Sequence, residues 1–137
     1  MVKGEWGMAS EQEQGFYRAH KRLDVWKESI DLAAHMYQVT SGFPKHETYG
    51  LQSQMRRAAV SIGANIAEGA ARNTKREFHQ FLGIANGSIS ELDTLIEVAY
   101  KLGYITDETK QKLDLMLVSI GRKLSGLIAK MRRSFEP

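Results

Sequence analysis

The chain has 137 residues, enough for one domain, and its 42% hydrophobic and 26% charged content is typical of globular proteins. It has no cysteine, which excludes disulfides, thiolate metal sites and cysteine nucleophiles. The formal net charge is +3, and the stretch between Asp114 and Glu136 contains five basic residues and no acid.

Residues 1–20 are rich in Gly, Glu and Gln without sustained periodicity, which predicts a flexible amino-terminal tail. No apolar run approaches the about 20 residues that cross a bilayer, and the amino terminus lacks the apolar stretch of a signal peptide. We therefore expect a cytoplasmic protein with no membrane partner and one domain over residues 21–137.

Four segments with helical periodicity follow in chain order, which predicts an all-α, antiparallel up-down-up-down four-helix bundle. The first is expected over residues 24–41 and the second over residues 48–71. A capping-box pattern at Thr74 opens the third, Gly103 ends it, and Thr106 caps the fourth. The expected core stripes are Trp26, Ile30, Ala33 and Tyr37; Leu51, Met55, Ala58, Ile62 and Ile66; Phe78, Phe81, Leu82, Ala85, Ile89, Leu92 and Ile96; and Leu113, Met116, Leu117, Ile120, Leu124, Leu127, Ile128, Met131 and Phe135.

Small residues form a second face on the two middle helices. Glycine within a helix costs about 1 kcal/mol relative to alanine, so a ridge of small residues indicates a close helix neighbour. Contact between subunits is one interpretation, and uneven packing within one subunit is the other. The predicted interface residues are Val60, Gly63, Ala64, Ala67, Gly83 and Gly87.

The stretch YGLQSQMRRAAVSI from Tyr49, continued by Asn65-Ile66-Ala67-Glu68-Gly69, resembles the signature of the bacterial four-helix-bundle proteins, also called 23S rRNA intervening-sequence proteins. Leu23-Asp24-Val25-Trp26, Phe43-Pro44, Lys75-Glu77-Phe78, Gly87-Ser88 and Leu102-Gly103-Tyr104-Ile105 match in order. The resemblance implies a ring-shaped homo-oligomer, with five subunits favoured, and no catalytic activity. Some members are encoded within 23S rRNA genes, and related proteins are nucleic-acid-binding accessory subunits of diversity-generating retroelements.

A polar flank lies beside the core stripe of the second helix, where Ser61, Asn65 and Glu68 recur at helical spacing between Arg57 and Arg72. An internal polar network is one interpretation, and a groove that accepts a phosphate or base edge is the other. The internal network predicts that Glu68→Ala costs about 1–3 kcal/mol, as loss of a buried hydrogen-bond partner does.

Basic residues at the ends of the predicted helices are the candidate nucleic-acid contacts. Repetition around a ring would add their charges into a field that displaces counterions from a phosphate backbone. The helix dipole is a simpler reason for basic residues at a helix carboxyl end. The candidates are Arg56, Arg57, Arg72, Lys75, Arg76, Lys130, Arg132 and Arg133.

The pattern predicts no enzyme, metal site, cofactor or small-molecule substrate. The four histidines are scattered, the Glu-x-x-His pairs of di-iron bundles are missing from the sequence, and no glycine-rich phosphate loop occurs. Glu28, Asp31 and His35 share one side of the first helix, which we interpret as a solvated face. The expected function is binding of nucleic acid, with structured RNA favoured, by a non-enzymatic oligomer. The alternative is a structural or adaptor module for a protein partner.

Overall fold

The computed structural model describes residues 19–137, in which every regular element is helical. Two short 3-10 helices, η1 (Ala19–Arg22) and η2 (Lys45–Glu47), accompany four long helices. The long helices are α2 (Asp24–Thr40), α3 (Leu51–Ala70), α4 (Lys75–Lys101) and α5 (Asp107–Phe135). Of the predicted tail, residues 1–18 lie outside the described part, whereas Ala19 and His20 belong to η1.

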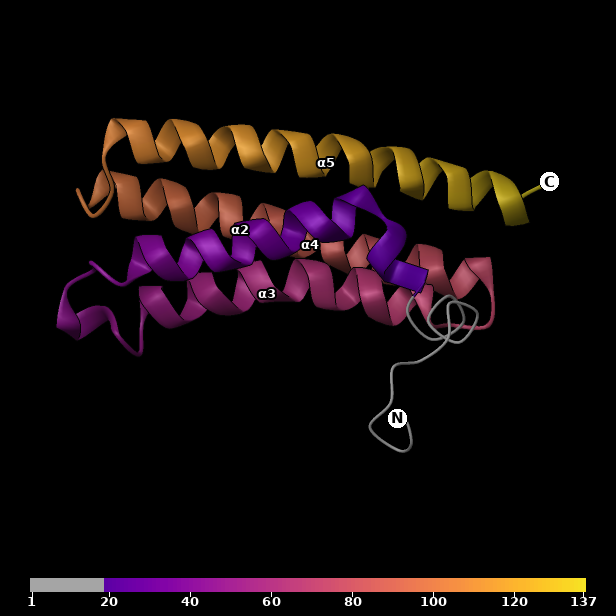
Figure 1. The fold of residues 1–137 in the computed structure, drawn as a ribbon, viewed down its shortest axis with the longest axis horizontal. Helices are drawn as coiled ribbons and strands as arrows, with labels where there is room; N and C mark the ends of the chain where they lie inside the picture. Colours follow the sequence, from indigo (N-terminus) through magenta and orange to yellow (C-terminus); the bar gives the residue numbers. More distant parts are fainter. Residues whose placement is uncertain (1–18) are drawn as a thin grey trace, which may run out of the picture.

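Consecutive long helices run antiparallel, and α2 also packs against α5, which closes the bundle (Figure 1). This arrangement confirms the predicted up-down-up-down four-helix bundle. The α3–α4 turn therefore lies at the same end as the start of α2 and the end of α5 (Figure 1). No helix within residues 19–137 has the length and hydropathy needed to cross a membrane.

Caps confirm three of the predicted helix boundaries, the start and end of α4 and the start of α5. The Thr74 hydroxyl oxygen accepts a hydrogen bond from the Glu77 N–H at 3.1 Å, which is the first half of a capping box. Thr106 caps α5 in the same way through the Thr109 N–H. Gly103, with φ at +78°, ends α4 in the left-handed conformation that favours glycine.

The predicted start of the second long helix is three residues too early. Residues 45–47 form η2, and α3 begins only at Leu51. The reason is local, because the Glu47 carboxylate accepts a hydrogen bond from the Leu51 N–H at 3.1 Å. A side chain from the preceding turn thus satisfies a free N–H at the amino end of α3.

The predicted core stripe is correct on α3, where all five residues are buried, and only half correct on α2, where Trp26 and Ala33 pack against the core but Ile30 and Tyr37 do not. On α2, Ile30 and Tyr37 are 43% and 47% exposed, whereas two hydroxyl residues are fully buried. Ser29 and Thr40 donate hydrogen bonds to carbonyls one turn earlier, at 2.7 and 2.8 Å, which satisfies their hydroxyls inside the core. The buried face of α2 is Val25, Ser29, Leu32, Met36 and Thr40.

Candidate nucleic-acid interface

The bundle separates the eight candidate basic residues into two groups. Arg56 and Arg57 lie near the start of α3, beside the end of α2. The other six lie at the opposite end of the bundle, around the α3–α4 turn and the last turns of α5 (Figure 1). We call these six the basic end: Arg72, Lys75, Arg76, Lys130, Arg132 and Arg133.

Aromatic rings hold two arginines of the basic end in place. The guanidinium carbon of Arg76, on α4, lies 4.5 Å from the centroid of the Phe135 ring, at the end of α5. That of Arg72 lies 4.6 Å from the centroid of the Phe81 ring. A guanidinium group that stacks on an aromatic ring remains charged. Its N–H donors lie in its own plane and remain available to an acceptor. The stacking therefore joins the end of α5 to the start of α4 and orders positive charge there.

The charge of the basic end is only partly compensated within residues 19–137. Arg72 forms an exposed ion pair with Glu68 at 3.2 Å. Lys75 and Arg76 form no ion pair with a described residue, and neither do Lys130, Arg132 and Arg133 in the last turns of α5. The 3-10 helix η1 adds Lys21 and Arg22 at the same end, a contribution that the sequence prediction missed.

The helix dipole explains part of this charge but not all of it. Arg132 and Arg133 occupy the last turn of α5, where the dipole stabilises cations. Lys75 and Arg76 occupy the first turn of α4, where the dipole disfavours them. Packing of α5 against α4 brings both groups together, so at least two cations lie there against the local electrostatic preference.

Arg56 differs from the basic end because its contacts are internal. Its Nε donates to the Thr40 hydroxyl at 2.8 Å and its Nη2 donates to the Tyr37 carbonyl at 3.3 Å. Its guanidinium carbon also lies 4.5 Å from the centroid of the Tyr37 ring. Arg56 thus caps the carboxyl end of α2 from α3, a structural role that sequence reasoning did not assign.

The predicted polar flank divides into two separate sets of contacts. Ser61 hydrogen-bonds Ser88 of α4 at 2.8 Å, and the Asn65 amide donates to the Ser61 carbonyl and hydroxyl. These half-buried groups are the internal polar network. Glu68 is exposed and pairs only with Arg72 among the described residues. Glu68 therefore does not belong to the buried network that the predicted cost of Glu68→Ala assumes, and Arg57 is exposed as well.

The predicted interface face also needs one correction. Gly63 is buried inside the bundle, where an added Cβ would lie 3.2 Å from Ile30 Cδ1 and 3.5 Å from Ser29 Cβ. It serves the packing of α2 on α3 and is not available to another subunit. The other residues reach the surface: Val60 and Ala64 are exposed, Ala67 is half-buried, and Gly83 and Gly87 have open space around them.

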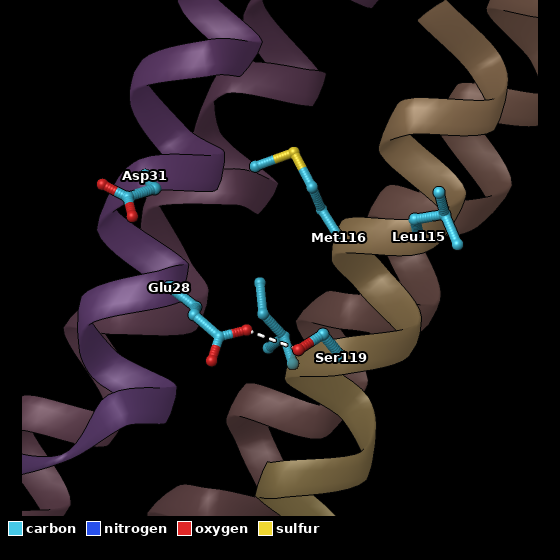
Figure 2. A pocket seen from close by; sticks show the side chains of 6 residues that line it. Glu28, Asp31, Leu115, Met116 and Ser119 are labelled. Carbon is cyan, nitrogen blue, oxygen red and sulfur yellow. Dashed lines mark hydrogen bonds between the residues drawn. The ribbon is translucent and has the colours of Figure 1, made fainter. Parts of the chain in front are cut away.

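A surface pocket of about 280 Å³ separates α2 from α5 (Figure 2). Glu28 extends across it from α2 and accepts a hydrogen bond from the Ser119 hydroxyl of α5 at 2.6 Å. The Lys123 ammonium also donates to Glu28, and these two hydrogen bonds hold the pKa of Glu28 below its usual value. The carboxylate is therefore committed to joining two helices, which leaves it poorly suited to act as a general base.

A second polar cluster joins α4 to α5. Asp93, Glu97 and Asp114 bring carboxylate oxygens within 4.8 Å of one another. The Lys110 ammonium lies 2.6 Å from both Glu97 and Asp114, and hydrogen bonds to Asp114 and then Glu97 raise the pKa of Lys110. Lys110 thus already pairs with two of the three carboxylates, one on each helix, so we interpret the cluster as a helix–helix link.

The fold and these contacts define a small all-α bundle in which two ion pairs join neighbouring helices, Lys110 with Glu97 and Lys123 with Glu28, and in which six basic residues gather at one end. The chain belongs to the family described as 23S rRNA-intervening sequence protein, which matches residues 21–126. The family assignment agrees with the resemblance read from the sequence.

Comparison with solved structures supports the fold. A protein of unknown function from the S23 ribosomal protein family of Bacteroides thetaiotaomicron VPI-5482 superimposes with a TM-score of 0.71. The two sequences are 24% identical, and the match covers 77% of this chain and 95% of that one. Comparison with curated proteins finds no match.

Proposed function

We propose that the protein binds structured RNA through the basic end and does so without catalysis. The observation that carries this proposal is the position of Lys75 and Arg76 in the first turn of α4. They oppose the helix dipole and lack ion-pair partners among the described residues, and Arg76 stacks on Phe135 at the basic carboxyl end of α5. Such charge is expected where the natural partner is a polyanion.

Oligomerisation would strengthen this binding. We propose a ring, with five subunits favoured by the family resemblance, in which the basic end is repeated in each subunit. Each end contributes few phosphate contacts, but contacts on one RNA add in free energy when several subunits reach it together. Because these contacts go to the backbone, we expect recognition of shape and charge with little sequence selectivity.

The test is the salt dependence of binding to a fully paired RNA duplex, measured by fluorescence anisotropy. The logarithm of the affinity should fall with the logarithm of salt, with a slope of about −0.7 to −0.9 for each phosphate contacted. Changing Lys130, Arg132 and Arg133 to glutamine should weaken binding and flatten the slope.

The matched control removes the same charge from the opposite end of the bundle. Lys45, Lys101 and Lys112 are exposed there, and their change to glutamine should leave most of the affinity for the duplex. Equal losses in the two triple variants would show that only net charge matters and would contradict a defined basic end.

A role as an adaptor for a protein partner is the second candidate. It is favoured by large apolar side chains on the outer surface, because Leu115 is 72% exposed and Val118 is 55% exposed on the same helix. If the wild-type protein fails to bind the duplex even at low salt, the adaptor role becomes the better-supported candidate function.

A further inference from the structure

A second aromatic and basic site lies at the corner where α2 meets α3, at the end of the bundle opposite the basic end. It is a surface pocket of about 260 Å³ whose lining includes Tyr37, Tyr49, Gln52, Ser53, Arg56 and Arg57. We call it the corner pocket. Among residues 19–137, two arginines and no acidic side chain contribute to its lining, so it is suited to an anionic ligand.

Two tyrosines give the corner pocket its aromatic character. The Tyr49 side chain follows η2 and is 96% exposed, which leaves both ring faces open to solvent. The Tyr37 ring is 47% exposed and carries the Arg56 guanidinium against it, at 4.5 Å from guanidinium carbon to ring centroid. A single exposed aromatic residue is ordinary on a protein surface. Two that line one pocket together with two arginines form a stacking platform.

The two arginines of the corner pocket differ in their contacts with the rest of the protein. Arg56 is fixed by its hydrogen bonds to Thr40 and to the Tyr37 carbonyl, so it presents an ordered planar cation. Arg57 is exposed and makes no hydrogen bond or ion pair with any residue in the described part of the chain. The first can support a stacked ring, and the second is free to contact a phosphate.

Glu47, an acidic residue near the corner pocket in the sequence, keeps its charge but does not line the pocket. Glu47 precedes Tyr49 by two residues, but its carboxylate accepts hydrogen bonds from the Leu51 N–H at 3.1 Å and the Tyr104 hydroxyl at 2.9 Å. These bonds direct Glu47 toward the α4–α5 turn, which carries Tyr104, and they hold its pKa below the usual value. The Gln52 side-chain amide donates to the Thr40 carbonyl, so its oxygen remains an acceptor for a base edge.

We propose that the corner pocket binds an unpaired nucleotide of RNA, with the base stacked on Tyr49 and the phosphate contacted by Arg57. Combined aromatic and basic side chains are how proteins recognise single-stranded nucleic acid. Bases within an A-form duplex are already stacked, and side chains cannot read their deep major groove. The pocket is smaller than the about 300–1,000 Å³ of typical ligand pockets, which agrees with one base rather than a larger molecule.

This inference deepens the proposed function and can be separated from it. The corner pocket and the basic end lie at opposite ends of α3, whose 20 residues span about 30 Å. A short single-stranded RNA therefore reports on the pocket, whereas a blunt duplex reports on the basic end. An RNA with both a helix and a loop could contact both.

The experiment measures binding of a single-stranded uridine oligonucleotide and of a fully paired RNA duplex to the full chain by fluorescence anisotropy. Alanine substitution of an aromatic residue that stacks on one base costs about 1–3 kcal/mol, or about a 5- to 150-fold loss of affinity. Tyr49→Ala should cause such a loss for the oligonucleotide and leave duplex binding unchanged. Tyr49→Phe, which keeps the ring, should bind as the wild type does.

Three controls show whether a loss of oligonucleotide binding arises at the corner pocket itself. Leu115→Ala removes an exposed apolar side chain of α5 that does not line the corner pocket, and it should leave oligonucleotide binding unchanged. Tyr49 is almost fully exposed, so its removal should not alter the unfolding temperature. Light scattering of Tyr49→Ala should give the wild-type mass.

Three outcomes would overturn the proposal. In the first, the wild type binds the duplex but not the oligonucleotide, which leaves the basic end as the RNA-binding surface. In the second, Tyr49→Ala binds the oligonucleotide as tightly as the wild type. In the third, Tyr49→Ala changes the oligomeric mass, which would make the corner a subunit contact. If the wild type instead binds the oligonucleotide but not the duplex, the result contradicts the proposed function and supports the corner pocket as a binding site.

Discussion

At the scale of single residues, Gly69 marks a close approach between α3 and α4. An added Cβ would lie 2.7 Å from the Phe81 Cβ and 2.9 Å from the Phe78 Cδ1, both closer than carbon atoms tolerate. We expect Gly69→Ala to lower the free energy of unfolding by about 1–3 kcal/mol, as overpacking does. Urea denaturation measures the change.

The control is Gly126→Ala on α5, where the added Cβ meets nothing within 4 Å. Alanine should there stabilise the helix by about 0.5–1 kcal/mol. If both variants are stabilised alike, the bundle relaxes around Gly69 and the close approach does not limit packing.

Glu68 and Asn65 lie three residues apart on α3 but differ in burial. Glu68→Ala removes only an exposed ion pair with Arg72, so the free energy of unfolding should change by no more than about 0.5 kcal/mol. Asn65→Ala removes half-buried hydrogen bonds to Ser61 and should cost about 0.5–1.5 kcal/mol. Chemical denaturation measures the free energy of unfolding of both variants. A larger loss for Glu68→Ala than for Asn65→Ala would contradict this assignment.

At the scale of elements, the contact of α2 with α5 depends on ionisation of Glu28. Because hydrogen bonds from Lys123 and Ser119 lower its pKa in the folded protein, Glu28 stabilises the fold above its ordinary value of 4.5. This contribution is lost as the pH falls below 4.5 through the lower folded pKa. The free energy of unfolding should therefore decrease over that acidic range.

Glu28→Gln should remove this part of the pH dependence and cost about 0.5–1.5 kcal/mol near neutral pH. The measurement is urea denaturation of the variant and wild type at neutral and acidic pH. Asp31→Asn, one turn along α2 and exposed, is the matched control and should keep the wild-type dependence. An unchanged pH profile in Glu28→Gln would show that other carboxylates determine the acid sensitivity.

At the scale of the whole molecule, Gly83 and Gly87 of α4 provide a test of subunit assembly, because an added Cβ at either would meet nothing within 4 Å. Gly87 lies on the surface with open space around it, so leucine there should not disturb the fold of one subunit. If this face packs on another subunit, Gly87→Leu should reduce the mass measured by light scattering, while circular dichroism shows equal or higher helix content.

Gly126→Leu places the same side chain on α5, away from the predicted interface face, and should leave the mass unchanged. A monomeric wild-type protein at micromolar concentration would contradict the ring and remove the subunit interpretation of the small-residue face.

The sequence by itself determined the helices, their order and most of the core. Period and caps are local properties, so Thr74, Gly103 and Thr106 mark boundaries without knowledge of the fold. The α3 stripe was predictable because its buried residues are all apolar. The α2 face was not, because Ser29 and Thr40 are buried with their hydroxyls bonded to their own helix.

Only the tertiary structure decided which charged side chains form hydrogen bonds or ion pairs within the bundle and which remain exposed without a partner among the described residues. Arg56 and Arg76 look alike in sequence, yet one caps α2 and the other stacks on Phe135 at the basic end. The antiparallel path placed the two sets of basic residues at opposite ends of the bundle. Such partners are far apart in the chain, and the distances that decide a charge's environment arise only when the helices pack.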